Sequence, residues 1–77
     1  MKVKIISPET LLYEGETSLV QLPGIDGSFE ILNNHAPIIS VLAKGTIRLT
    51  NGKETQTFDI KSGVVESSKN NIQILVQ

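Results

Sequence analysis

GTIRLTNGKETQTFDI, residues 45–60, is the stretch of sequence that decides the fold. Apolar and polar residues alternate on both sides of Asn51-Gly52, a pattern typical of half-buried strands. Asn51 and Gly52 both tolerate positive φ, and this pair is a strong signal for a two-residue hairpin turn. With these two residues as the loop, Leu49 would face Glu54. The stretch therefore predicts an antiparallel hairpin whose tip extends past the core into solvent.

The same alternation recurs along most of the chain. It occurs in KVKII, residues 2–6, and in NIQILVQ, residues 71–77. A second hairpin through SSKNNI would place Val65 on the same face as Ile74 or Val76. No window of three or more turns has apolar residues at helical spacing. Short strands joined by hairpins, with almost no helix, predict an all-β fold, a small antiparallel β-sandwich or flattened barrel.

Length and composition exclude several classes of protein. A chain of 77 residues is expected to form one domain, residues 1–77. Seven Lys and Arg residues stand against eight Asp and Glu, with no basic cluster among aromatic residues, which argues against nucleic-acid binding. Without cysteine, neither a disulfide nor a thiolate metal site can form. The longest mostly apolar run, residues 37–43, is far short of the ~20 residues that span a bilayer. The first residues read as a strand and not as a signal peptide, so we expect a soluble, unprocessed protein.

Few residues could do covalent chemistry. His35 is the single histidine, and it could meet Asp26 or Asp59 and a serine, but no local signature of a nucleophile supports a triad. Metal ligands at the usual spacing are also missing. Gly24 and Gly27 are not followed by Lys-Ser/Thr or by a helix, so they predict a tight turn with positive φ and not a phosphate site. The sequence therefore predicts a protein that is not an enzyme.

The lone histidine lies in a shaped loop. NNHAP, residues 33–37, lies between two strand-like segments, residues 28–32 and 38–43. The asparagines tolerate left-handed conformations, and Pro37 stiffens the exit from the loop. A histidine in such a loop is more often a hydrogen-bonded structural residue than a functional one.

Residues 22–49, LPGIDGSFEILNNHAPIISVLAKGTIRL, resemble the signature region of a known family. The family is the epsilon subunit of F-type ATP synthases, called delta in mitochondria. The shared pattern is a Gly-x-x-Gly turn, a following aromatic and apolar strand, His-Ala-Pro, and then Gly-x-Ile. Here it is carried by Gly24, Gly27, Phe29, Ile31, His35, Ala36, Pro37, Ile38, Ile39, Gly45 and Ile47. His-Ala-Pro at this distance after the turn is fairly specific, and the flanking segments extend the resemblance to essentially the whole chain.

Three features depart from the family pattern. Glu30 occupies a position where many members have glycine. Gly63 follows Ser62, where many members have two glycines. Most bacterial members continue into a pair of C-terminal helices that can inhibit the enzyme, whereas this chain stops at Gln77. Met1 and the closing strand favour a naturally short protein that lacks the inhibitory helices; a shortened form is the alternative.

The resemblance implies a role in the central stalk of an F1Fo ATP synthase. The fold would be a sandwich of about ten short strands in two sheets. One end would rest on the polar loops of the c-ring and one side would pack on the gamma subunit, so that ring rotation is coupled to ATP synthesis. No catalytic residue, metal, cofactor, nucleic acid or homo-oligomer is implied, and contact with the membrane would be indirect. The location would be peripheral, on the cytoplasmic face of a bacterial inner membrane. The alternative is a free-standing β-sandwich adaptor.

The resemblance also assigns two sets of contact residues. The set expected to face the c-ring is Asp26, Gly27, Ser28 and Glu30. Many members have a carboxylate at the Ser28 position facing basic ring loops, so here Asp26 and Glu30 would supply the charge. The set expected to face gamma is His35, Ala36, Pro37 and Ser40. We expect the interleaved apolar residues to belong to the core; they are Phe29, Ile31, Ile38 and Leu42.

Overall fold

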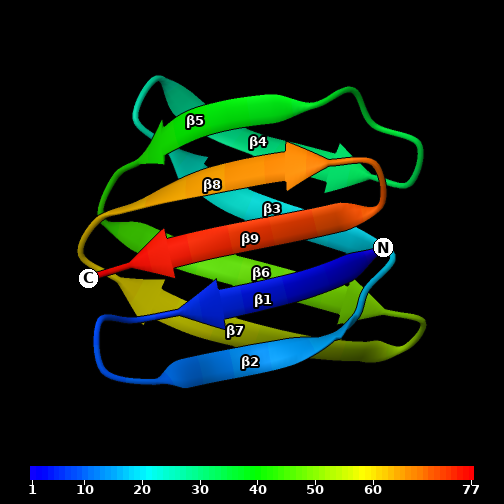
Figure 1. Ribbon diagram of the computed structural model, residues 1–77, viewed down its shortest axis with the longest axis horizontal. Coiled ribbons are helices and arrows are strands. Elements are labelled where there is room, and N and C mark those ends of the chain that lie inside the picture. The colour runs from blue at the N-terminus through cyan, green and yellow to red at the C-terminus, as the bar shows by residue number, and fades with distance from the viewer.

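The chain folds into nine β-strands, as the period-two pattern predicted (Figure 1). A computed structural model describes residues 1–77. The strands are β1 (Lys2–Ile6), β2 (Leu11–Glu16), β3 (Leu19–Gly24), β4 (Gly27–Leu32), β5 (Ile38–Leu42), β6 (Gly45–Asn51), β7 (Glu54–Ile60), β8 (Gly63–Ser68) and β9 (Asn71–Val76). The chain forms no helix with the length and hydropathy needed to span a bilayer.

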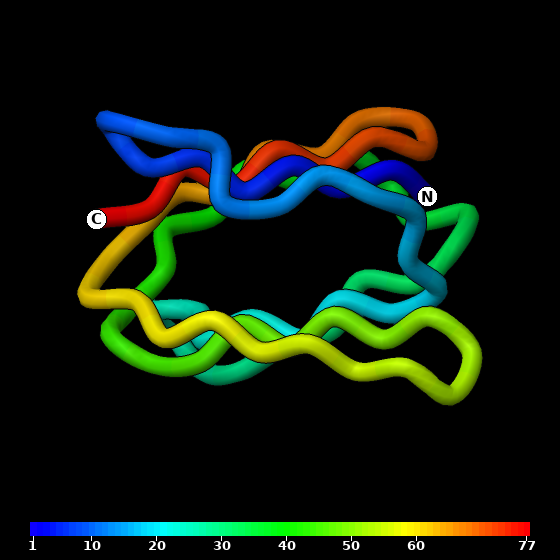
Figure 2. Tube along the Cα trace, turned by 90° about the horizontal axis from the view of Figure 1, so that it is seen from below, coloured from blue at the N-terminus to red at the C-terminus, as the bar shows by residue number.

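The strands form the two layers of a β-sandwich. One layer has the order β2-β1-β9-β8-β5, and the other has the order β4-β3-β6-β7. Figure 2 shows the two layers from the side, one above the other. A single pair, Gly24 with Leu42, continues the hydrogen-bonded sheet from β3 to β5. The expected two sheets are therefore the two layers of one curled sheet, and the strands number nine where about ten were expected.

All strand pairs are antiparallel except one. The first strand, β1, forms a hairpin with β2 on one side and pairs in parallel with the last strand, β9, on the other. Val3 lies beside Ile72 and Ile5 beside Ile74, so the buried faces of the two strands coincide. The first and last strands of the chain are thereby hydrogen-bonded to each other within one layer.

The core is built from the inward positions of the alternating strands. Its members are Val3, Ile5, Val20, Leu22, Ile31, Leu42, Ile47, Leu49, Ile60, Val65, Ile72, Ile74 and Val76. Each such side chain contributes roughly 1.5–3 kcal/mol when it is fully buried. Of the residues expected in the core, Ile31 and Leu42 are buried, and Phe29 and Ile38 are half-buried against it. At the open edge, the rings of Tyr13 and Phe58 join β2 to β7 with centroids 5.8 Å apart.

The hairpin of β6 and β7 forms with a different register from the predicted one. Leu49 pairs with Gln56, and the two-residue loop is Gly52-Lys53 instead of Asn51-Gly52. Only the first loop residue has positive φ, 64° at Gly52, which matches a type II′ turn. The predicted pairing was therefore wrong by two residues, but a shift of two leaves every side chain on its predicted face. The second predicted hairpin is confirmed, because Val65 pairs with Ile74.

The turn between β3 and β4 uses its two glycines in different ways. Gly27 has a φ of 126°, as predicted for a glycine in a tight turn. Gly24 does not have positive φ, so that part of the prediction was wrong. A Cβ atom on Gly24 would lie 2.5 Å from the carbonyl oxygen of Gly27 and 2.8 Å from the ring of Phe29. Close approach, and not backbone conformation, is what requires glycine at position 24.

Candidate functional site

The residues expected to face the c-ring lie at one end of the sandwich. Asp26 is exposed at the tip of the β3–β4 turn. Ser28 and Glu30 follow on β4 and are both exposed. Residues two apart on a strand point to the same side, so Ser28 and Glu30 share the outer face of their layer. The structure thus brings these two together and leaves Asp26 beyond them at the tip.

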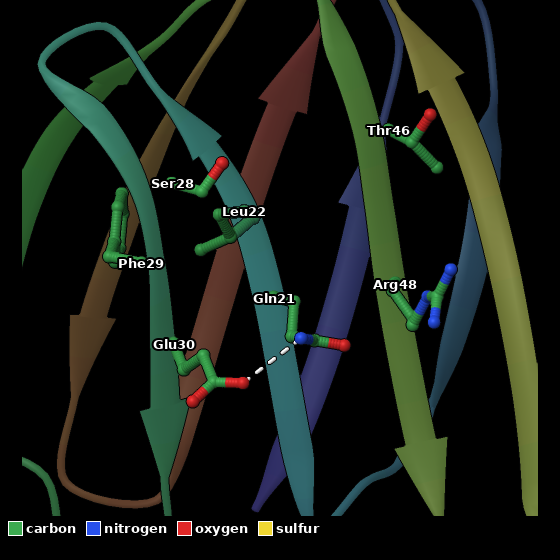
Figure 3. A pocket seen from close by; sticks show the side chains of 7 residues that line it. All are labelled: Gln21, Leu22, Ser28, Phe29, Glu30, Thr46 and Arg48. Atoms are coloured by element: carbon green, nitrogen blue, oxygen red, sulfur yellow. Dashed lines mark hydrogen bonds between the residues drawn. The ribbon is translucent and has the colours of Figure 1, made fainter.

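Ser28 and Glu30 line a polar depression of about 630 Å³ that spans three strands (Figure 3). Gln21 on β3 lies between Glu30 on one side and Arg48 on the other, because it pairs with both. The Gln21 side-chain amide donates a 3.0 Å hydrogen bond to the Glu30 carboxylate. Arg48 is exposed and forms no ion pair. The depression therefore presents a carboxylate held in place and a free guanidinium.

Sequence reasoning did not single out Gln21 or Arg48. The alternation in GTIRLT does place Arg48 on the face opposite the buried Ile47. No sequence signal showed that β3 would lie between β4 and β6, so Arg48 could not be connected with Glu30.

The geometry supports recognition and not covalent chemistry. No group of three or more His, Cys, Asp and Glu side chains is placed to hold a metal ion. The Asp59 carboxylate accepts a 2.8 Å hydrogen bond from the Thr46 hydroxyl. His35 is hydrogen-bonded to backbone carbonyl groups and to no serine or aspartate side chain. What the site can offer a ligand is hydrogen bonds and charge pairing.

His35, in the set expected to face gamma, ties two loops together. Its Nδ1 lies 3.0 Å from the carbonyl oxygen of Leu32, and its Nε2 lies 3.1 Å from that of Ser68. A neutral imidazole can donate to one of these oxygens, whereas an imidazolium can donate to both. The ring therefore joins the end of β4 to the β8–β9 turn, which is a structural role.

The other members of this set lie in two places, the loop of residues 33–37 and strand β5. Ala36 and Pro37 are exposed beside His35. Ser40 pairs with the buried Val65 and lies on the core-facing side of β5, half-buried. The structure therefore groups His35 with Ala36 and Pro37 and separates Ser40 from them.

The turn with Asp26 and the loop with His35 and Pro37 lie at opposite ends of β4. The β3–β4 turn precedes this strand and the loop of residues 33–37 follows it, as Figure 1 shows. Six residues of strand span roughly 20 Å. A sandwich that is contacted at both of these ends can bridge two partners.

These features define a small protein of the β-sandwich class. The chain belongs to the family described as the beta-sandwich domain of the ATP synthase Delta/Epsilon chain, whose model matches residues 1–77. The resemblance found in residues 22–49 is thereby confirmed.

Named relatives agree with this family, and a solved structure has the same fold. The chain is 40% identical over 75 residues to the ATP synthase epsilon chain of Leptospira interrogans, covering 97% of this chain and 59% of that relative. It is 36% identical over 77 residues to the epsilon chain of Chlorobium limicola, covering 99% and 88%. A chain in the central stalk and c-ring structure of the Tetrahymena thermophila mitochondrial ATP synthase has the same fold, with a TM-score of 0.83 at 19% identity, covering 99% and 62%.

The shares of the relatives' lengths differ. The chain spans 59% of the Leptospira relative but 88% of the Chlorobium relative. Some members of the family are therefore little longer than this sandwich, and others carry a substantial further segment.

Proposed function

We propose that the protein is a non-catalytic subunit of the rotor of an F1Fo ATP synthase. It links the gamma subunit to the membrane c-ring and couples ion-driven rotation to ATP synthesis. The observation that carries this proposal is the family match over the whole chain. The named relatives, which are ATP synthase epsilon chains, support it. The complex would place the protein at a membrane, on the cytoplasmic face of a bacterial inner membrane.

The β3–β4 turn and its neighbouring depression are proposed to face the c-ring. Asp26, Gly27, Ser28 and Glu30 contribute this surface. The Glu30 carboxylate is fixed by Gln21 and is available to a basic ring loop, because only one of its oxygens is engaged by that bond. Glu30 lies two residues after Ser28 on β4, and its carboxylate supplies the negative charge that position 28 lacks.

The opposite end of β4 is proposed to face the gamma subunit. His35 holds the loop in shape, and Ala36 and Pro37 present exposed side chains beside it. Ser40, on the core-facing side of β5, is not included in this surface. A rigid loop suits a contact that transmits torque, because a mobile one would be ordered at an entropic cost on binding.

Affinity purification tests the proposal. The tagged chain is expressed in its own host and purified from membranes under conditions that keep the synthase intact. We expect the gamma and c subunits to co-purify with it. If the chain is recovered with neither the gamma subunit nor the c subunit, that result would contradict the rotor assignment and favour a free-standing adaptor.

A further inference from the structure

The amino group of Met1 is surrounded by three hydrogen-bond acceptors. It lies 3.1 Å from the carbonyl oxygen of Thr17, 3.2 Å from the side-chain oxygen of Asn33 and 3.2 Å from the Glu16 carboxylate. An ammonium group has three N–H donors and accepts no hydrogen bond, so its donors match the acceptors in number. We call Met1, Glu16, Thr17 and Asn33 the amino-terminal cluster.

The amino-terminal cluster lies where the chain crosses from one layer to the other. Glu16 ends β2 in the first layer, and Leu19 begins β3 in the second. The N-terminus lies beside this crossing in both views of the chain (Figures 1 and 2). Asn33 follows the end of β4, which belongs to the second layer. One charged group therefore joins segments that belong to both layers.

Thr17 makes its backbone hydrogen bonds with Met1. The Thr17 amide donates a 2.9 Å hydrogen bond to the Met1 carbonyl oxygen, and the Thr17 carbonyl accepts one from the Met1 ammonium. Thr17 is only 3% exposed, and the Met1 side chain packs against the core. A buried carbonyl group that loses its donor costs free energy. The ammonium is therefore part of the packed structure.

Asn33 is the first residue of the loop of residues 33–37, which we propose to face gamma. His35 holds the middle of this loop through two backbone carbonyl groups. Just after the loop, the Ile38 amide donates a 3.1 Å hydrogen bond to the Ser67 hydroxyl. The N-terminal ammonium holds the beginning of the loop through the Asn33 side chain. Each part of the loop thus has its own anchor.

An acyl group, or a further residue, on the Met1 nitrogen would dismantle the amino-terminal cluster. Either change converts the ammonium into an uncharged amide with one N–H. At most one of the three acceptors then keeps its hydrogen bond, and Glu16 loses its ion pair. The exposed Glu16 carboxylate can be solvated by water, but the buried Thr17 carbonyl cannot. The beginning of the loop is therefore expected to loosen.

We propose that the loop of residues 33–37 requires a free α-ammonium group on Met1, and that N-terminal acylation opens this loop. A formyl or acetyl group on this nitrogen must then be removed by hydrolysis before the loop closes. Water adds to the acyl carbon and the C–N bond breaks. Formate or acetate leaves, and the proton that it releases leaves the nitrogen as an ammonium. Weaker binding of gamma by an acylated chain rests on the proposed function, whereas the loosened loop does not.

A matched pair of chains tests the requirement for a free ammonium. A fusion protein cleaved directly before Met1 yields the free ammonium, and one cleaved earlier leaves Gly-Ser on the Met1 nitrogen. Intact mass verifies each N-terminus. We expect the melting temperature of the extended chain to be lower by about 4–8 °C. The Thr17 amide should exchange its hydrogen about fivefold faster or more. Equal melting temperatures and equal exchange in the two chains would overturn the proposal.

An acetylated chain, made by co-expression with an N-terminal acetyltransferase, tests acylation itself. It should show the same fall in melting temperature as the Gly-Ser chain, because both carry an amide at this nitrogen. An acetylated chain that matches the free chain would show that the charge and the lost donors do not matter, and would overturn the proposal.

Substitution of the acceptors separates the amino-terminal cluster from a general effect of added residues. Asn33→Ala should lower the melting temperature of the free chain but change that of the extended chain little, because the bond is already lost there. Glu16→Gln removes the ion pair and should behave in the same way. Glu9→Gln, at an exposed position without an ion pair, is the matched control and should change neither chain. Additive losses from Asn33→Ala and the extension would contradict the proposal.

Binding of purified gamma from the same host distinguishes this inference from the proposed function. We expect gamma to bind the extended chain about fivefold more weakly than the free chain. Equal binding by both chains, together with equal melting temperatures, would overturn this inference alone. Failure of both chains to bind gamma would contradict the proposed function, and the melting temperatures would still decide this inference.

Discussion

The Nε2 atom of His35 lies 3.1 Å from the carbonyl oxygen of Ser68, 33 residues further along the chain. The bond joins the β4–β5 loop of one layer to the β8–β9 turn of the other. The second ring nitrogen holds Leu32 at the end of β4. The signature histidine therefore fixes the backbone of the loop that is proposed to face gamma.

Replacing His35 with alanine should destabilise the isolated domain. The contacts of the ring nitrogens with the Leu32 and Ser68 carbonyl groups are lost, and a neutral imidazole can donate to one of them, so we expect a loss of about 1 kcal/mol in the free energy of unfolding. For a domain of this size the melting temperature would fall by about 4–8 °C. Thermal unfolding checks this, with Lys69→Ala in the same turn as control. An unchanged melting temperature for His35→Ala would show that the bridge adds nothing.

Gly24 and Gly27 should respond differently to alanine. Gly24→Ala brings a methyl group against the Gly27 carbonyl and the Phe29 ring, and we expect a cost of about 2–3 kcal/mol from overpacking. Gly27→Ala meets no neighbouring atom, so its cost of about 1–2 kcal/mol comes from backbone strain alone. Chemical denaturation of both variants checks the order. A smaller loss for Gly24→Ala than for Gly27→Ala would contradict the close approach at Gly24.

Tyr13 and Phe58 should be energetically coupled. Their rings meet edge to face across the open edge between β2 and β7. A double-mutant cycle with Tyr13→Leu and Phe58→Leu should give a coupling of about 0.5–1.5 kcal/mol. Additive losses would mean that the aromatic contact does not hold the layers together.

Ser28→Lys should impair assembly without unfolding the domain. Ser28 is exposed beside the Glu30 carboxylate, so a lysine there is tolerated in the isolated chain but repels a basic ring loop. We expect markedly less c subunit to co-purify, with a melting temperature within about 2 °C of the unmodified chain. Thr55→Lys on β7 is the control. A parallel fall in melting temperature and c-subunit recovery would make Ser28 a structural residue.

The alternation of residue types was sufficient to predict the faces of the strands. Ile72, Ile74 and Val76 are buried as their spacing predicted, and Val65 pairs with Ile74. The register of β6 with β7 was predicted wrongly because Gly52 can be either the second residue of a loop at 51–52 or the first residue of a loop at 52–53. Period-two alternation cannot separate them when the resulting shift is two residues.

Surfaces that depend on long-range pairing were beyond sequence reasoning. The exposed apolar residues Val41, Val64 and Leu75 are scattered along the sequence, and only the pairing of β5 with β8 and of β8 with β9 aligns them. Arg48 and Glu30 are also far apart in the sequence. Only the pairing of β3 with both β4 and β6 places Gln21 between them. Sequence motifs could identify the β3–β4 turn and the loop of residues 33–37, because the residues of each lie close together in the sequence.

Cross-linking from the two ends of β4 tests the central claim most directly. Asp26→Cys and Pro37→Cys each place one thiol at an exposed position in a chain that otherwise has none. In membranes that contain the assembled synthase, we predict that Asp26→Cys links to a c subunit and Pro37→Cys links to gamma. Links to neither subunit, or links exchanged between the two positions, would contradict the account of this protein as a bridge between shaft and ring.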